Sequence, residues 1–351
     1  MKKKSLSVKK KIHNILLANL KNPKIKKSYG VFKKNINKLG DIRKFAAAVS
    51  GGPDSLALSY FLKCYSLQNK TKVFFYQVDH GLRKNSLKES RLVQRKMKNF
   101  DINSKILLWR GKKPYSNIQS IAREKRYSYI FKQCTKDKVN TILTAHHEGD
   151  LYENFFIRIL RGSGLRGIVS FNSLQVRLDN NINICRPLIE LKKNDLIYTA
   201  KKVFNFYLKD PSNKNSVFRR SRIRKLIQEL KLEGLDFNKL KLTINNLSDS
   251  NNAINYYVRN NIKNNSKYIK NKSMYILSLK FFDNPDEIIF RSLSKLIKEV
   301  GQKYYSARGK SILNILNEIN RQNFKKLTLS GCIIEKLNNS VIIYKEFTKK
   351  S

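Results

Sequence analysis

Residues 50–55 read Ser50-Gly51-Gly52-Pro53-Asp54-Ser55, directly after the apolar run 45–49 and directly before Leu56-Ala57-Leu58. This order predicts a buried strand, a glycine turn and the start of a helix. Two glycines let the backbone pass close to an anion, and free N–H groups at a helix N-terminus point at that anion. Ser50 and Ser55 add hydroxyl donors, and Asp54 offers an oxygen ligand for the Mg²⁺ that accompanies a nucleoside triphosphate. The segment therefore predicts a site for the phosphates of a nucleotide.

Two better-known phosphate loops do not fit this segment. A Walker A loop ends in Gly-Lys followed by Ser or Thr, and a dinucleotide fingerprint needs Gly-x-Gly-x-x-Gly. Ser-Gly-Gly-x-Asp-Ser instead resembles the signature of the PP-loop pyrophosphatases, which adenylate a substrate with ATP and release pyrophosphate. The resemblance implies that ATP binds to Ser50, Gly51, Gly52, Pro53, Asp54 and Ser55. It does not choose among the members of the superfamily, and an ordinary glycine turn is the alternative.

The chain has a formal charge of +48, from 73 Lys and Arg against 25 Asp and Glu. A surplus of this size favours a polyanionic partner such as nucleic acid, although many of the lysines would be solvated in any case. The sequence has no apolar run of about 18 residues, so we expect no membrane span. Its four cysteines form no C-x-x-C pair, which argues against a zinc site, an iron–sulfur cluster or a disulfide framework. We expect reduced thiols in a cytoplasmic protein.

Strand and helix patterns alternate through the first half of the chain. Strands are predicted at 72–80, 104–109 and 141–145, and helices at 86–99, 116–134 and 146–160. Strands separated by helices of this length predict a parallel sheet of the α/β class, in which ligands bind at the carboxyl ends of the strands. Three polar clusters fall at such ends, namely 50–55, Asp79-His80 and His146-His147. The pattern therefore predicts a single site.

The second half has a weaker pattern. A hairpin is predicted at 174–188, a helix at 190–206, a turn at Asp210-Pro211-Ser212-Asn213 and a basic helix at 218–232. The chain is then expected to be helical, apart from two short strands within 328–344.

Several segments together resemble the tRNA(Ile)-lysidine synthase family. They occur in the order typical of that family and read as follows: Val-Asp-His-Gly-Leu-Arg at 78–83, Gln-Ser-Ile-Ala-Arg-Glu-Lys-Arg-Tyr at 119–127, Thr-Ala-His-His-Glu-Gly-Asp-Leu-Tyr-Glu at 144–153, Arg-Gly-Ser-Gly at 161–164, Arg-Pro-Leu at 186–188, Asp-Pro-Ser-Asn at 210–213 and Phe-Arg-Arg at 218–220. The resemblance implies a PP-loop fold, similar to the adenine nucleotide alpha hydrolases. It also implies that ATP adenylates C2 of the first-anticodon-position cytidine of an isoleucine tRNA with a CAU anticodon, and that free L-lysine then displaces AMP.

That chemistry indicates a role for each candidate residue. Asp54 is the expected Mg²⁺ ligand, and Arg123 is expected to hold the α-phosphate as its charge develops, with Arg126 as the alternative one turn away. Asp150 and Glu153, at i and i+3 on one helix face, are expected to bind the ammonium group of lysine. His146 or His147 would contact phosphate or accept a proton. The alternatives are an ordinary surface charge for the acids and Arg123, and a structural role for the histidines. The arginines expected to bind tRNA are Arg161, Arg166, Arg219, Arg220 and Arg222.

The chain departs from the family pattern at Gly149, where the family usually has the first Asp of an Asp-Asp pair, and at Leu151 and Asn154. We expect Asp150 to carry the acidic role, because it keeps the spacing to Glu153. The C-terminal part resembles only the first of the two C-terminal domains of longer members, which indicates a short form. Members of the family are often dimers, so the resemblance also allows a homodimer.

The expected organisation has three parts. Residues 1–27 carry ten lysines and no acidic residue, without the apolar core of a signal peptide. We therefore expect a basic arm over 1–40 with a short helix at 12–20. A PP-loop ATP-binding catalytic domain would follow over 41–225, and a smaller, mainly helical tRNA-binding domain over 226–351. The remaining alternatives are another PP-loop tRNA-modifying enzyme, or a non-catalytic RNA-binding protein that retains a nucleotide pocket.

Overall fold

The computed structural model of the chain describes residues 2–83, 85–111, 115–116, 118–172, 174–177, 182–209, 219–303, 306–319, 321 and 324–346. The chain folds as two compact units, Met1–Leu240 and Lys241–Ser351. No helix of the described ranges is both long and apolar enough for a membrane span. The predicted turn at 210–213 and the start of the basic helix at Phe218 fall outside these ranges.

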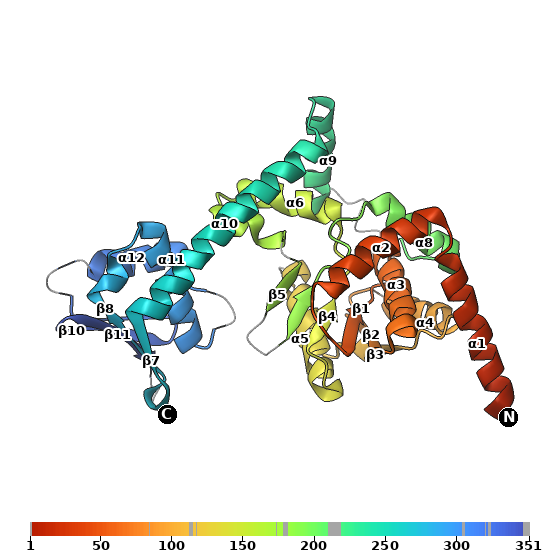
Figure 1. Cartoon of the computed structure of the whole chain (residues 1–351), viewed down its shortest axis with the longest axis horizontal. Helices are drawn as coiled ribbons and strands as arrows, with labels where there is room; N and C mark the ends of the chain where they lie inside the picture. The colour runs from red at the N-terminus through yellow and green to blue at the C-terminus, as the bar shows by residue number, and fades with distance from the viewer. Residues whose placement is uncertain are drawn as a thin grey trace. The chain divides into compact units, whose positions relative to one another are not determined.

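The first unit is built on a six-stranded sheet with the order β3-β2-β1-β4-β6-β5 (Figure 1). Its strands are β1 Lys44–Ala48, β2 Lys72–Asp79, β3 Ser104–Leu108, β4 Thr141–Leu143, β5 Gln175–Arg177 and β6 Asn183–Cys185. All neighbouring pairs are parallel except β5 with β6, which form the predicted hairpin. The predicted parallel α/β sheet is confirmed.

Helices connect these strands or follow the last of them, and helices lie on both faces of the sheet. They are α3 Pro53–Asn69, α4 Ser86–Lys98, α5 Ile118–Asp137, α6 Glu148–Ile159, α7 Leu165–Ile168, α8 Lys193–Phe204 and α9 Arg219–Leu232, with a short 3-10 turn η1 at Val169–Phe171. Successive strand residues point to opposite faces. Phe45 and Ala47 therefore join the core formed with α3, α4 and α8, whereas Ala46 joins the core formed with α5. Because the strands are parallel, β1, β2 and β4 end at the same edge of the sheet.

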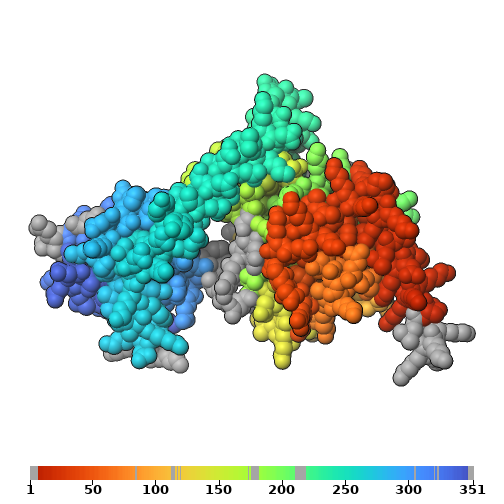
Figure 2. Space-filling model, in the orientation of Figure 1, coloured from red at the N-terminus to blue at the C-terminus, as the bar shows by residue number. Residues whose placement is uncertain are grey.

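The first 40 residues differ from the expected basic arm. They form two helices, α1 Lys2–Asn19 and α2 Pro23–Asn37, in place of one short helix. Leu16, Ile25 and Phe32 are fully buried in the core of the first unit. The Tyr60 hydroxyl of α3 donates to the Leu16 carbonyl at 2.9 Å. Their apolar residues recur at helical spacing between the lysines, so these helices are an integral layer of the unit, drawn in red in Figure 2.

The second unit contains a five-stranded antiparallel sheet with the order β7-β8-β11-β10-β9. Its strands are β7 Ser266–Ile269, β8 Met274–Ser278, β9 Lys326–Leu329, β10 Cys332–Leu337 and β11 Ser340–Lys345. Its helices are α11 Asp286–Val300 and α12 Gly309–Ile319, with 3-10 turns η3 Lys270–Lys272 and η4 Leu279–Phe282. The long helix α10, Phe237–Asn265, begins in the first unit and ends in the second.

The sheet of the second unit goes beyond the two strands predicted at 328–344. Strands β7 and β8 follow the Asn-rich end of α10. Two consecutive residues of β7, Lys267 and Tyr268, are both exposed, so no alternation of buried and polar residues marks this strand. The first compact unit also extends to Leu240, past the expected boundary at 225, because α9 packs against α6.

We expect Leu16→Ala to lower the free energy of unfolding by about 2–5 kcal/mol, because the side chain is fully buried between α1 and the core. Urea unfolding would measure this change. The matched control is Ile15→Ala, since Ile15 is the preceding residue and its side chain is 48% exposed. Equal, small effects of the two substitutions would show that α1 is not part of the folded core.

Candidate functional site

The loop that connects β1 to α3 turns at Gly51. Gly51 has φ of +82°, a conformation that side chains other than glycine rarely adopt. A Cβ atom at this position would lie 2.5 Å from Val93 Cγ2 and 2.9 Å from Leu208 Cδ1. The Gly51 carbonyl also accepts a hydrogen bond from the Leu208 N–H at 2.9 Å. Both the backbone angle and the close packing therefore require glycine here.

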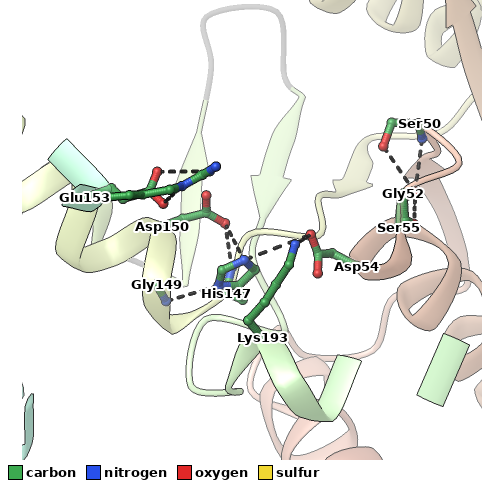
Figure 3. Close-up of polar contacts among 10 residues, drawn as sticks. Ser50, Gly52, Asp54, Ser55, His147, Gly149, Asp150, Glu153 and Lys193 are labelled. Atoms are coloured by element: carbon green, nitrogen blue, oxygen red, sulfur yellow. Dashed lines mark hydrogen bonds and ion pairs between the residues drawn. The ribbon is translucent and has the colours of Figure 1, made fainter. Parts of the chain in front are cut away.

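The two serines of the loop hold its shape. The Ser50 N–H and the Ser50 hydroxyl both lie 3.2 Å from Ser55 Oγ, and the Ser55 hydroxyl donates to the Gly52 carbonyl at 3.0 Å (Figure 3). Gly52 is the N-cap of α3 and provides no side-chain acceptor for the first N–H groups of that helix. These N–H groups can therefore bind an anion. The geometry fits the predicted phosphate site.

Asp54 lies in the first turn of α3 and has one occupied and one unused carboxylate oxygen. Its Oδ2 accepts a hydrogen bond from Lys193 Nζ of α8 at 2.5 Å. Its Oδ1 is buried and has no hydrogen-bond partner within the described ranges. An unused carboxylate oxygen beside a phosphate site fits a Mg²⁺ ion, which is usually held by one or two carboxylates together with phosphates and water. Within the described part of the chain, no group of three or more His, Cys, Asp or Glu side chains is arranged to hold a metal ion, so the fit to Mg²⁺ rests on Asp54.

His147 and Asp150 form a capping box at the N-terminus of α6. His147 Nδ1 accepts the Gly149 N–H at 3.0 Å, and Asp150 Oδ2 accepts the His147 N–H at 3.0 Å. The ring proton of His147 is therefore on Nε2, which lies 3.6 Å from Asp150 Oδ2 and 3.9 Å from Asp54 Oδ2. Burial raises the pKa of Asp150, but the neighbouring His147 ring, the His147 N–H and the charge of Arg220 outweigh this effect and leave that pKa below its usual value. Asp150 is therefore ionised.

Glu153 is buried one turn further along α6 and is paired with Arg224 of α9. Arg224 Nε donates to Glu153 Oε1 at 2.5 Å, and Nη2 lies 3.4 Å from Oε2. The Glu153 carboxylate raises the pKa of Arg224 above its usual value although burial lowers it. A substrate ammonium group would therefore have to share Glu153 with Arg224 or displace it.

His146 is held in the neutral form at the carboxyl end of β4. Its Nδ1 lies 2.9 Å from Thr144 Oγ1, and its ring meets the Phe171 ring edge-on at 4.9 Å between centroids. Burial, the largest effect, and the charges of Arg186, Arg123 and Arg220 together lower the pKa of His146 to about 3, against the opposing effect of Asp150. At neutral pH this side chain can only donate or accept a hydrogen bond without carrying charge.

The two candidate phosphate arginines have different surroundings. Arg123 is exposed, lies 5.1 Å from the centroid of the Tyr127 ring and is close enough to His146 to lower its pKa. Arg126 instead donates from Nε to His80 Nε2 at 3.3 Å. These surroundings favour Arg123 as the arginine beside the His146 end of the site.

The five predicted tRNA-binding arginines are not equally close to this site. The charge of Arg220 acts on both His146 and Asp150. Arg219 Nη2 lies 3.5 Å from the Ile157 carbonyl, whereas Arg222, Arg161 and Arg166 are exposed. Arg220 is thus linked to the polar cluster by its charge.

Three basic residues of the site were not predicted as site residues. Lys193 and Arg224 pair with acids that lie 139 and 71 positions away in the sequence, and nothing in the sequence distinguishes them from the other basic residues. Arg186 belongs to the Arg-Pro-Leu motif, and that motif was the available signal. Its side chain is buried and lies 4.5 Å from the centroid of the Phe171 ring.

Comparisons with known proteins agree with this geometry. The sequence profile of the PP-loop domain matches residues 23–230. The chain is 34% identical over 328 residues to the tRNA(Ile)-lysidine synthase of Rickettsia typhi (strain Wilmington) and 32% identical over 327 residues to that of Rickettsia bellii (strain OSU 85-389); each alignment covers 92% of this chain and 75% of the relative. The corresponding enzyme of Orientia tsutsugamushi (strain Boryong) is 33% identical over 91% of this chain and 72% of the relative.

The chain belongs to the tRNA(Ile)-lysidine synthase family. Among solved structures, it resembles the U34-tRNA thiolase NcsA from Methanococcus maripaludis with its [4Fe-4S] cluster, at a TM-score of 0.53 and 17% identity over 63% of this chain and 76% of that chain. At this identity the likeness shows the PP-loop fold alone. This member of the synthase family departs from the family pattern at Gly149. A side chain at this position would be crowded by the His147 ring, because a Cβ atom would lie 2.9 Å from His147 Cε1.

We expect Gly51→Ala to destabilise the protein by roughly 2–4 kcal/mol, since it combines an unfavourable φ with overlap against Val93. The same variant should lose ATP affinity. The control is Gly52→Ala, because Gly52 has ordinary φ and a Cβ there would lie 3.6 Å from Ser50 Oγ. Thermal unfolding and ATP titration would compare the two, and normal stability of Gly51→Ala would contradict this account of the loop.

We expect His146 to make stability depend on pH. Its pKa is near 3 in the folded chain and 6.5 in the unfolded chain, so between these values the unfolded state binds one more proton. Stability therefore falls as pH falls through this window, by up to about 1.4 kcal/mol per pH unit from this group. Urea unfolding from pH 7 to pH 4 should show a shallower fall for His146→Gln. Identical slopes would mean that the folded protein protonates His146 normally.

Proposed function

We propose that the protein ligates L-lysine to C2 of the cytidine at the first anticodon position of an isoleucine tRNA with a CAU anticodon. ATP adenylates C2 with release of pyrophosphate, and the lysine amine then displaces AMP to form lysidine. Lysidine pairs with A instead of G, so the codon specificity changes from AUG to AUA. The observation that carries this proposal is that the phosphate loop, Asp54, His147 and Asp150 meet at one sheet edge in a chain of the lysidine synthase family.

For the adenylation step, we assign the phosphates of ATP to the N–H groups at the start of α3 and to the loop 50–55. Asp54 would hold Mg²⁺, which when bound neutralises part of the triphosphate charge. Arg123 would bind the α-phosphate, because its side chain is exposed and its charge already reaches His146. His146 stays neutral there and would hydrogen-bond to the phosphate or the base without adding charge.

For the lysine step, the ammonium group of free lysine needs an ionised acid nearby. Asp150 provides one, since its pKa lies below the usual value. Glu153 lies one helical turn away on α6 and would join it if lysine takes over part of the contact with Arg224. His147 Nε2 lies between Asp54 and Asp150 and would orient both carboxylates.

For tRNA binding, we propose that positive charge provides most of the affinity. The candidates are Arg161, Arg166, Arg219, Arg220 and Arg222, together with residues of the second unit. The exposed lysines of α1 and α2 add to this charge, since residues 1–40 contain no acidic residue. Contacts of this kind release counterions, so the affinity for tRNA would fall steeply with salt. A homodimer remains compatible with this proposal.

The cysteines support lysine ligation over sulfur transfer by another PP-loop enzyme. Cys64, Cys134, Cys185 and Cys332 are all buried. Burial raises the pKa of the first three to about 12 and of Cys332 to about 11, so none of these thiols ionises readily. Thiolation chemistry needs a reactive thiolate or a cluster ligand set. A non-catalytic RNA-binding protein would not need the acidic residues at the carboxyl end of the sheet.

The test is incorporation of labelled lysine into an isoleucine tRNA with a CAU anticodon, in the presence of ATP and Mg²⁺. The methionine tRNA with the same anticodon is the control. Label in the isoleucine tRNA alone, with one AMP released per lysine, is expected. AMP release without bound lysine would point to another PP-loop reaction, and no AMP release would point to the non-catalytic alternative.

We expect Asp150→Asn to raise the KM for lysine by roughly tenfold to a hundredfold, which corresponds to one charge-assisted contact of about 1.5–3 kcal/mol. Pyrophosphate release with ATP and tRNA should continue, because adenylation does not need lysine. Glu153→Gln should act in the same direction, and Arg224→Gln is its control. If Arg224→Gln reproduces the Glu153→Gln effect, Glu153 acts by holding Arg224 and does not bind lysine itself. Loss of pyrophosphate release in Asp150→Asn would place Asp150 in the ATP site.

A further inference from the structure

Lys193 lies in the first turn of α8 and reaches across to the phosphate loop. Its ammonium nitrogen is 2.5 Å from Oδ2 of Asp54, a residue of helix α3 (Figure 3). The Lys193 side chain is 44% exposed and the Asp54 side chain is 22% exposed. The contact is therefore accessible to solvent, and a four-carbon side chain can leave it without unfolding any element.

The Asp54 carboxylate is only partly neutralised by this contact. One oxygen faces Lys193 and, at 3.9 Å, the His147 ring, whereas the other oxygen is buried and has no partner in the described part of the chain. A divalent cation with oxygen ligands would use the same carboxylate and carries twice the charge of an ammonium group. The ammonium of Lys193 and a divalent cation on the same carboxylate would repel each other, so binding of the cation weakens the contact between Lys193 and Asp54.

The displaced ammonium has a new partner close at hand. Asp54 is the second residue of α3, next to the N–H groups that we assign to the phosphates of ATP. An ammonium group released from Asp54 would lie among phosphate oxygens, and lysine is an effective point charge for phosphate. The divalent cation neutralises only part of the triphosphate charge, so the Lys193 ammonium would offset part of the negative charge that remains.

We propose that Lys193 is a positioning residue that occupies Asp54 in the nucleotide-free protein and transfers to the phosphates when ATP and its divalent cation bind. The inference rests on the proposed assignment of Asp54 as the cation ligand. It gives Lys193 opposite effects on two ligands. Lys193 weakens binding of the cation alone, because it competes for Asp54, and it strengthens binding of the nucleotide.

The experiment compares Lys193→Gln with the full-length wild type and uses Mn²⁺ as the probe. Without nucleotide, the affinity for Mn²⁺, measured by electron paramagnetic resonance of the free ion, should rise about threefold to tenfold. With Mg²⁺ present, the affinity for a non-hydrolysable ATP analogue should fall by about tenfold. The matched control is Lys192→Gln, because Lys192 is the adjacent exposed lysine and its side chain provides no cap for α8. That control should leave both affinities unchanged.

Opposite changes distinguish this role from a structural one, since a damaged site would lose affinity for both ligands. Unchanged Mn²⁺ affinity in Lys193→Gln, or a fall in both affinities, would overturn the proposal. Lys193→Arg should keep most of the nucleotide affinity because it keeps the charge.

Asp54→Asn tests separately whether Asp54 is the cation ligand, the assignment on which the role of Lys193 rests. In both the wild-type and the Lys193→Gln background it should abolish Mn²⁺ binding. If Mn²⁺ still binds, Asp54 is not the cation ligand and the proposed ATP site is wrong. If Asp54→Asn abolishes Mn²⁺ binding but Lys193→Gln has no effect, the proposed ATP site is supported and the proposed role of Lys193 is wrong.

Discussion

The architecture of the site depends on one tight backbone turn at Gly51. The chain leaves the buried strand β1 and enters α3 there, with a positive φ and with Val93 and Leu208 packed where a side chain would otherwise lie. This turn aims the first N–H groups of α3 at the carboxyl edge of the parallel sheet. The side chains that follow β2 and β4 reach that same edge, because parallel strands all end on the same side. The turn and the parallel order together create a single polar site.

Within the site, each of three acids has a hydrogen-bonded or ion-paired partner. Asp54 pairs with Lys193, Glu153 with Arg224, and Asp150 with the N–H and ring of His147. In the proposed reaction the substrates bring both a polyanion, ATP, and a cation, lysine. Binding in such a site would therefore be an exchange of partners, in which an incoming charge replaces one already present. An exchange avoids leaving a buried acid without a partner, which would be energetically costly.

Sequence patterns predicted most of the first unit, because its strands and helices alternate with clear periodicity and the phosphate loop has an unambiguous order of residues. The histidines were predicted as site residues because they follow a strand, and Asp150 and Glu153 because they lie at i and i+3 in a segment that resembles the lysidine synthase family. Lys193 and Arg224 could not be predicted, since in a chain with 73 Lys and Arg a basic residue carries little information. The same excess of lysine hid the apolar face of α1 and α2. Strand β7 was missed because no burial pattern marks this edge strand next to an Asn-rich helix, and β8 was missed although its buried residues alternate.

The folded unit of this protein is longer than the segment that it shares with other PP-loop domains, because α1 packs into its core. The shared segment starts at residue 23, but Leu16 fills the core and its carbonyl is the acceptor of the Tyr60 hydroxyl. A fragment trimmed to the homologous region would expose Tyr60 and the thiol of Cys64, which both contact Leu16. Such a fragment would be prone to aggregation and oxidation. For expression and crystallisation, the borders of sequence homology are therefore the wrong place to cut this chain.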